Sequence, residues 1–184
     1  VLESCRHLSS RGFDITYLPV KNDGLIDLNE LKDAITDKTL LVSIMGVHNE
    51  IGVIQPLEEI GKICRDNDVF FHTDCAQAVG KINLDVNKMN IDLMSISGHK
   101  IYGPKGVGAL ILNHSPSDFL SPISHGGLQE QDVRSGTVPV FLTVGLSEAL
   151  KFLNSEHDEN RKYLLDLRQT FLSKLNKLTS EIQI

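Results

Sequence analysis

The 184-residue chain has no tryptophan, only 5% aromatic residues and no long apolar run. No segment approaches the length of a membrane-spanning helix, and no targeting segment is recognisable. Basic residues are outnumbered by acidic ones, 18 to 24, for a formal net charge of −6. Because the chain also lacks a basic stripe with interleaved aromatics, we expect neither a nucleic-acid nor a membrane partner.

Cysteine is also scarce, and its pattern is uninformative for metal binding. Cys5, Cys64 and Cys75 are odd in number, lack CxxC spacing and have no histidines at metal-ligand intervals. We therefore predict no metal site, a reducing compartment and three small buried or partly exposed thiols. The chain begins at Val1 without a methionine, which suggests that an N-terminal portion precedes it.

The 41% hydrophobic content is enough to bury a core, and its periodicity alternates between strand and helix. The expected elements are helix 2–8, strand 13–18, helix 27–35, strand 40–45, helix 56–67, strand 69–74, strands 93–96 and 109–112, helix 140–153 and helix 156–178. This alternation predicts an α/β fold with a mostly parallel sheet flanked by helices. Residues 113–139 lack periodicity, and loops of that length in compact domains are usually functional.

A glycine-rich turn with Lys100 at its centre separates the expected strands 93–96 and 109–112. Its glycines exclude a helix and allow close backbone approach to a bound molecule. Both strands are expected to be buried. A lysine at the edge of such a dry sheet is desolvated, which favours the neutral amine of Schiff-base lysines. Taken alone, however, the turn favours ordinary loop lysines at Lys100 and Lys105.

Asp74 ends the expected strand 69–74, and Gln77 follows three residues later. Ligands of open α/β sheets lie beyond the carboxyl ends of the strands, so Asp74 and Lys100 are expected to face one crevice. A pyridoxal phosphate (PLP) enzyme needs a lysine for the aldehyde and usually an acid for the pyridine nitrogen. By itself Asp74 is more typical of a helix N-cap, and both interpretations are compatible.

Three motifs in order, His72-Thr-Asp-x-Ala-Gln, Ser97-Gly-His-Lys-Ile-Tyr-Gly-Pro-Lys-Gly and Arg134-Ser-Gly-Thr-Val-Pro, resemble the cysteine desulfurases of the class V aminotransferase family. The resemblance is greatest to the proteobacterial and mitochondrial enzymes of iron–sulfur cluster assembly. It implies the large domain of a fold-type I PLP-dependent transferase over 1–154. Residues 155–184 are then a linking helix and the start of a small C-terminal domain, which the apolar stripe at Leu164, Leu167, Phe171 and Leu175 would contact.

The resemblance implies seven cofactor-binding residues: Asn49, Asp74, Gln77, Ser97, His99, Lys100 and Thr137. Two of them, Asp74 and Lys100, would also be catalytic. Lys100 would carry PLP and act as the base, while Asp74 would keep the pyridine nitrogen protonated.

The other five roles are also implied by the resemblance. Asn49 and Gln77 would bond the phenolic oxygen, and Ser97 and His99 the phosphate. Thr137 would reach the phosphate of the neighbouring subunit's cofactor, so a homodimer is expected.

The chain departs from the family pattern at five positions: His48, Cys75, Leu128, Gln131 and Asp132. Asparagine, alanine and glycine are usual at the first three, and arginine-glycine at the last two. His48 is interpreted as a partly exposed loop histidine.

The implied activity is removal of sulfur from L-cysteine to give L-alanine and an enzyme persulfide. An iron–sulfur scaffold protein is the expected partner, in the bacterial cytoplasm or the mitochondrial matrix. The family's sulfur-accepting cysteine loop lies beyond Ile184, so none of the three cysteines is expected to take the sulfur. Two alternatives stay open: a truncated, impaired copy acting as an interaction or cofactor-binding module, and a related class V aminotransferase.

Overall fold

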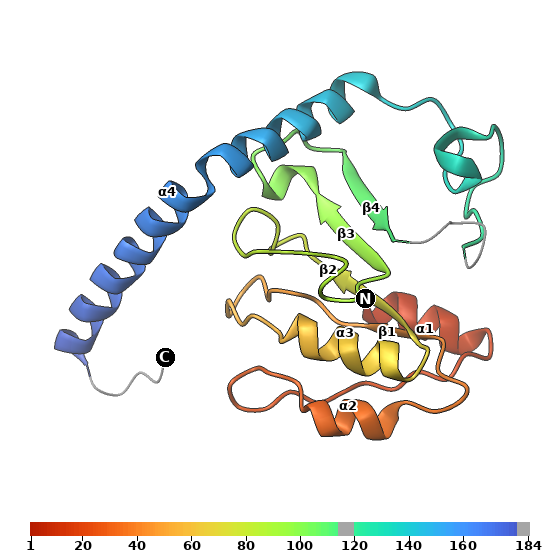
Figure 1. The fold of residues 1–184 in the computed structure, drawn as a ribbon, viewed down its shortest axis with the longest axis horizontal. Helices are drawn as coiled ribbons and strands as arrows, with labels where there is room; N and C mark the ends of the chain where they lie inside the picture. Colours follow the sequence, from red (N-terminus) through yellow and green to blue (C-terminus); the bar gives the residue numbers. More distant parts are fainter. Residues whose placement is uncertain (114–119, 180–184) are drawn as a thin grey trace. The chain divides into compact units, whose positions relative to one another are not determined.

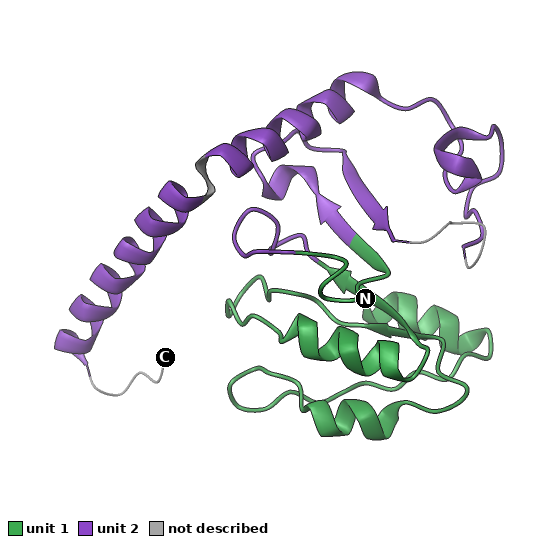
Figure 2. Ribbon diagram, in the orientation of Figure 1, with its two compact units in different colours: residues 1–74, 85–94 green, residues 75–84, 95–184 purple. Residues whose placement is uncertain are grey.

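The computed structural model describes residues 1–113 and 120–179, without the side chains of residues 156 and 157. It divides into two compact units, shown in green and purple in Figure 2. Unit 1 contains residues 1–74 and 85–94, and unit 2 contains residues 75–84 and 95–184. These compact units do not correspond to the two domains predicted from the sequence, 1–154 and 155–184, and that domain boundary stays a prediction.

The helices and strands labelled in Figure 1 are α1 (Leu2–Ser10), α2 (Leu28–Ala34), β1 (Leu41–Ser43), α3 (Leu57–Asp66), β2 (Phe70–Asp74), β3 (Leu93–Ser97), β4 (Gly108–Leu112) and α4 (Val140–Leu178). Two short 3₁₀ helices are η1 (Gly98–Lys100) and η3 (Gln129–Asp132). The strands form one sheet in the order β1-β2-β3-β4. β1 and β2 are parallel, with Val42 opposite Phe71. This mostly parallel α/β arrangement confirms the predicted class.

The core of unit 1 forms where α3 packs near β2. The apolar residues of α3 fall on one helical face, and Ile60 at its centre is fully buried, as is Phe71 of β2. Gly61 is on the same face because the backbone of Met89 passes directly over it. A Cβ at Gly61 would lie 1.8 Å from the Met89 carbonyl oxygen. The packing of α3 therefore depends on the absence of a side chain at this position.

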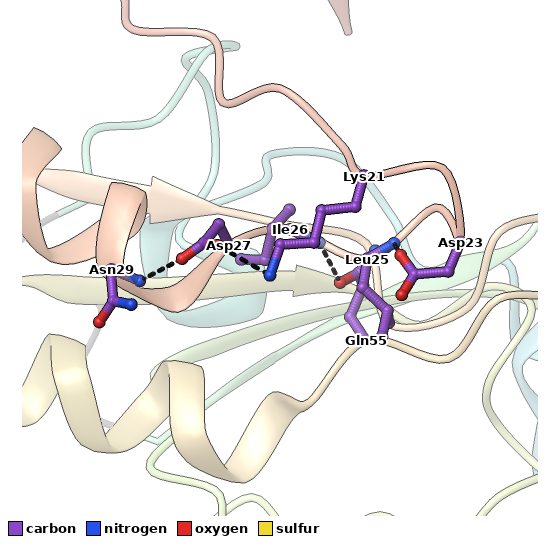
Figure 3. Close-up of polar contacts among 7 residues, drawn as sticks. All are labelled: Lys21, Asp23, Leu25, Ile26, Asp27, Asn29 and Gln55. Atoms are coloured by element: carbon purple, nitrogen blue, oxygen red, sulfur yellow. Dashed lines mark hydrogen bonds and ion pairs between the residues drawn. The ribbon is translucent and has the colours of Figure 1, made fainter.

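A turn before α2 is held by side-chain hydrogen bonds, shown in Figure 3. Gln55, which is buried, accepts from the Ile26 N–H at 3.2 Å. Its side-chain amide also donates to the Gly24 carbonyl at 2.9 Å. Asp27 caps α2 by accepting from the Asn29 N–H at 2.8 Å. The amide of Gln55 thus ties the turn at 24–26 to the loop that follows β1.

The core of unit 2 is an apolar cluster built around the first half of α4. Ile101, Leu146 and Leu153 are buried in it, and four partly buried residues pack against them: Val79, Val107, Ala149 and Leu150. Gly80 also touches this cluster, because a Cβ there would lie 2.7 Å from Leu153 Cδ1. The turns on either side of β3 therefore share one apolar anchor.

Two expectations for the N-terminal part were wrong. Residues 13–19 have no regular secondary structure, and Phe13 and Tyr17 are exposed. Alternation of apolar residues is not sufficient for a strand, which needs a neighbouring strand to bond its backbone. β1 is shorter than predicted and only Val42 in it is buried, although the Ile44 and Gly46 N–H groups continue the bonding to β2.

Three expectations for the C-terminal part also need correction. Residues 98–100 form a single 3₁₀ turn, and β4 is largely exposed. The two predicted helices are one, because α4 continues from Val140 to Leu178. Asn154 and Ser155 cost a helix only about 0.5 kcal/mol each, far less than proline, so they do not end it. The Ser155 hydroxyl donates back to the Phe152 carbonyl at 2.8 Å.

The remaining helices and strands are confirmed within one or two residues: α1, α2, α3, β2 and β3. The apolar stripe on the second half of α4 is exposed at Leu164, Leu167 and Phe171. Among the described residues, no helix is long and apolar enough to cross a membrane.

The contact at Gly61 predicts a large loss of stability from a single methyl group. Gly61→Ala should lower the free energy of unfolding by about 2 kcal/mol or more, because the Met89 backbone must move despite the helix-favouring alanine. Urea unfolding followed by circular dichroism measures this change. Lys62→Ala, at the exposed neighbouring position, is the control and should change stability by less than about 0.5 kcal/mol. Equal stability of the two variants would contradict the packing.

The cap of α2 predicts a specific acid sensitivity. The hydrogen bond from Lys21, 2.7 Å from Asp27, and the Asn29 N–H lower the pKa of Asp27. A lowered pKa means that Asp27 stabilises the fold above its unfolded value of about 3.9, and that this contribution is lost as pH falls through the lower folded value.

We therefore expect Asp27→Asn, which keeps a capping side chain but loses the charge, to lose less stability than the parent chain between pH 7 and pH 2. Urea midpoints across this range are the measurement. Asp33→Asn, which removes an exposed acid of the same helix, is the control and should follow the parent chain. Parallel curves for Asp27→Asn and the parent would refute the role of the charge.

Candidate active site

In unit 2, Lys100 lies in a loop that closes on itself. The Gly98 N–H donates to the Val107 carbonyl, and the Gly103 N–H donates back to the Gly98 carbonyl, each at 2.9 Å. There is no room for side chains at these glycines. A Cβ at Gly98 would be 2.9 Å from the Val107 oxygen, and one at Gly103 would be 2.8 Å from the Gly98 oxygen. The glycine pattern of the motif is thus a packing requirement of this loop.

The same loop turns Lys100 outward. Gly98 before it is buried and Ile101 after it is 2% exposed, whereas the Lys100 side chain is exposed. The expectation that the Lys100 amine is desolvated was therefore wrong for this chain. Lys100 lies in the turn beyond the end of β3 and not at the edge of a dry sheet. What the structure provides is an accessible primary amine on a tightly closed loop.

Two other candidates, Ser97 and His99, lie next to each other at the start of this loop. The Ser97 hydroxyl and His99 Nδ1 are 3.1 Å apart, within hydrogen-bond distance. The His99 ring is exposed. A hydroxyl and an imidazole beside the glycine-rich turn are donors of the kind that bind phosphate oxygens.

Gln77 lies in the turn that follows β2, also in unit 2. Lys81 donates from its ammonium to Gln77 Oε1 at 2.6 Å. The pKa of Lys81 is lowered, first by desolvation and then by the positive charge of Lys100. Sequence reasoning missed Lys81, although its position four residues after Gln77 in a helix-like turn was a usable signal.

Asp74, in unit 1, is the last residue of β2, as predicted. Its carbonyl accepts from the Gly46 N–H at 2.8 Å, which joins it to the segment that follows β1. His72 lies two residues earlier on the same face of the strand, with its Nδ1 2.8 Å from the Ser43 hydroxyl. Burial lowers the pKa of His72, and the nearby Asp74 carboxylate opposes that shift.

Asn49, also in unit 1, is exposed in a turn organised by its neighbour His48. The His48 Nδ1 accepts from the Glu50 and Ile51 N–H groups, at 3.2 and 3.4 Å. Its backbone bonds to Val53 and Gly52 close the same turn. The histidine that stands at the usual asparagine position therefore shapes the turn that presents Asn49, a role that its interpretation as a loop histidine did not include.

Thr137, in unit 2, is exposed in an irregular segment before α4. The Arg134 guanidinium donates to the Gly136 carbonyl at 3.2 Å, and the Gly136 N–H donates to Gln129 Oε1 at 3.1 Å. Part of the predicted loop, residues 114–119, lies outside the described residues.

Upstream, η3 contains two of the departures from the family pattern. Gln131 and Asp132 have φ values of 54° and 64°, in the left-handed region that favours glycine. The backbone thus adopts at Asp132 the conformation that suits the glycine usual in the family. The third departure, Leu128, has an ordinary φ of −84° and is exposed.

The cysteines differ in their surroundings. Cys64 is buried, and desolvation together with the Asp92 carboxylate raises the pKa of its thiol to about 12. Such a thiol stays protonated near neutral pH and is a poor nucleophile. Cys75 is fully buried after β2. Within residues 1–113 and 120–179, no cluster of three or more histidine, cysteine, aspartate or glutamate side chains is arranged to hold a metal ion.

Five of the seven candidates, Gln77, Ser97, His99, Lys100 and Thr137, thus belong to unit 2. Asn49 and Asp74 belong to unit 1, where the bond from Gly46 to Asp74 joins the segment after β1 to the end of β2. Asp74 and Ser97 are the last residues of β2 and β3, and Gln77, His99 and Lys100 follow them within three residues, at the strand ends where ligands of open α/β sheets bind.

Comparisons with known proteins extend over the whole chain. The family model described as aminotransferase class-V matches residues 1–183. Cysteine desulfurase IscS of Rickettsia massiliae (strain Mtu5) is 55% identical over 184 residues, which are 100% of this chain and 45% of that protein.

Solved structures agree with this. A NifS-like protein matches with a TM-score of 0.91 and 38% identity over 97% of this chain and 49% of its own. SspA, solved in complex with cysteine, matches with a TM-score of 0.80 and 48% identity over 82% of this chain and 44% of its own. The chain spans about half the length of the relatives that it matches, and it belongs to the class V aminotransferase family.

Proposed function

We propose that the protein containing this chain is a PLP-dependent cysteine desulfurase, which removes sulfur from L-cysteine and leaves L-alanine. The observation that carries the proposal is Lys100, an accessible amine on a closed glycine-rich loop directly after β3. Supporting it are the similarity to IscS proteins and the SspA structure solved with cysteine.

The donor set of the chain fits PLP. Lys100 supplies an amine for the aldehyde, and the Ser97 and His99 pair supplies donors for the phosphate. Asp74, at the end of β2, supplies a carboxylate for the pyridine nitrogen. Asn49 and Gln77 supply amide N–H groups for the phenolic oxygen.

Within this proposal each side chain has a defined task in handling protons. When bound, PLP withdraws electrons from the substrate's α-carbon. Asp74 holds a proton at the pyridine nitrogen through its carboxylate, which maintains that withdrawal. The Lys100 amine, once free of the aldehyde, accepts the α-proton of cysteine at Nζ and returns a proton to the product. Gln77 and Asn49 fix the plane of the ring by donating hydrogen bonds.

The sulfur acceptor is proposed to be a cysteine of the protein outside residues 1–184, as the family resemblance implies. The high thiol pKa of Cys64 and the complete burial of Cys75 argue against these two cysteines of the chain. We further propose a homodimer in which Thr137 binds the phosphate of the partner's cofactor, and delivery of the sulfur to an iron–sulfur scaffold protein in the cytoplasm or mitochondrial matrix. The exposed position of Thr137 is compatible with a role across subunits.

The first prediction concerns the lysine that carries the cofactor. Borohydride reduction of the full-length protein loaded with PLP, followed by peptide mapping, should place the pyridoxyl group on Lys100. Lys100→Arg should abolish trapping, whereas Lys105→Arg, in the same loop, should retain it. Trapping on Lys105, or on no lysine in a folded protein, would refute the proposal and favour an interaction module without cofactor chemistry.

The second prediction concerns Asp74. Asp74→Ala should still bind PLP at Lys100, but its kcat for alanine formation should fall by about 10²–10³-fold, as expected when one charge contact of the transition state is lost. Asp66→Ala, which removes an exposed acid at the end of α3, is the control and should retain kcat. Near-normal turnover by Asp74→Ala would show that the pyridine nitrogen does not need this carboxylate.

A further inference from the structure

The turn after β2 brings Lys81 onto Gln77. The backbone bonds from Val79 to Cys75 and from Ile82 to Ala78 give this segment helix-like spacing, which puts residues four apart on the same side. The Lys81 ammonium donates to Gln77 Oε1 at 2.6 Å. A charged donor forms a stronger hydrogen bond than a neutral donor in the same setting.

This contact determines which end of the Gln77 amide is available. An ammonium group can only donate hydrogen bonds, so it must pair with the amide oxygen. The amide nitrogen and its two N–H donors are then directed away from Lys81. Without Lys81, the oxygen and nitrogen could exchange places by rotation about the last side-chain bond, and the amide oxygen could then face the phenolic oxygen, which is also an acceptor.

The same turn is anchored beside the Lys100 loop. Val79, between Gln77 and Lys81, packs against the cluster that contains Ile101, the residue after Lys100. The Cys75 N–H also donates to the Ser95 carbonyl of β3 at 2.9 Å. These contacts all lie within unit 2, and they hold the Gln77 amide and the Lys100 amine on neighbouring turns.

From this geometry we propose that Lys81 is a positioning residue, which orients the Gln77 amide so that its N–H groups serve the phenolic oxygen of PLP. The inference rests on the proposed function, because it gives Gln77 its cofactor contact. It extends that function to a residue that itself touches neither substrate nor cofactor. The pKa of Lys81 is lowered mainly by desolvation, and the positive charge of Lys100 adds to this shift, which supports the closeness of the two turns.

The test uses the full-length protein and compares Lys81→Met with Lys151→Met. Lys151 is a matched control, since it is also an exposed lysine of unit 2 with one side-chain partner, Glu148, at 2.7 Å. Lys81→Met should weaken PLP binding about tenfold in equilibrium dialysis and shift the visible absorption maximum of the bound cofactor. Lys151→Met should do neither, and Lys81→Arg, which keeps the donor, should restore both.

A double-mutant cycle tests whether Lys81 acts through Gln77. Gln77→Ala should reproduce the spectral shift, and adding Lys81→Met to it should change PLP affinity by less than about twofold. A full tenfold effect of Lys81→Met in the Gln77→Ala background would overturn the inference, as would a Lys81→Met spectrum identical to that of the parent.

A measurement without cofactor separates this inference from the proposed function. In the cofactor-free protein, the side-chain amide NMR signals of Gln77 should move on Lys81→Met and stay unchanged on Lys151→Met. Unmoved Gln77 signals would refute the orienting contact itself. Failure of the parent protein to retain PLP at Lys100 would instead refute the proposed function, whatever the amide signals show.

Discussion

The closed loop from Gly98 to Val107 is the constraint on which the chemistry of unit 2 depends. Its backbone bonds leave no space for a Cβ at Gly98 or Gly103. With Gly98 and Ile101 directed into the protein, Lys100 has only the outward direction left. The conformation of an exposed lysine is usually poorly restrained, but here the backbone of Lys100 is held by the bonds of Gly98 before it and the burial of Ile101 after it.

The apolar cluster that holds this loop also includes residues of α4 and of the turn after β2. Ile101 shares its apolar cluster with Leu146 and Leu153 of α4 and with Val79 of the turn after β2. Burying side chains of this size contributes about 1.5–3 kcal/mol each, more than the hydrogen bonds of either turn. The packing of Ile101 and Val79 in this cluster therefore contributes most to holding the turns of Lys100 and Gln77 in place. The contact from Lys81 then orients the side-chain amide of Gln77.

In unit 1, polar contacts rather than apolar packing hold the turns that carry candidate residues. His48 accepts from two backbone N–H groups in the turn that presents Asn49, and Gln55 connects the end of that turn to residues 24–26. Buried and partly buried amides and imidazoles of this kind determine loop geometry because leaving their partners unsatisfied costs about 1–3 kcal/mol. Loops at the ends of short strands depend on such contacts more than on propensity.

Prediction from the sequence succeeded where the period of apolar residues agrees with the way the folded segment is buried or bonded. The face of α3 and strand β2 were identified because buried apolar residues recur there at the helix and strand periods. It failed at 13–18, where alternation is present but no neighbouring strand bonds the backbone. It also failed in α4, where Asn154 and Ser155 weaken the helix too little to end it.

By itself, the sequence determined the α/β class, the family, and the order in which Asp74, Gln77 and Lys100 follow their strands, since these depend on local patterns and motif spacing. The tertiary structure alone decided that Lys100 is exposed, that His48 shapes the turn of Asn49, and that Lys81 contacts Gln77. The physical reason is that exposure and hydrogen-bond partners depend on which turns pack together. That packing is a property of the folded chain as a whole, which no local pattern contains.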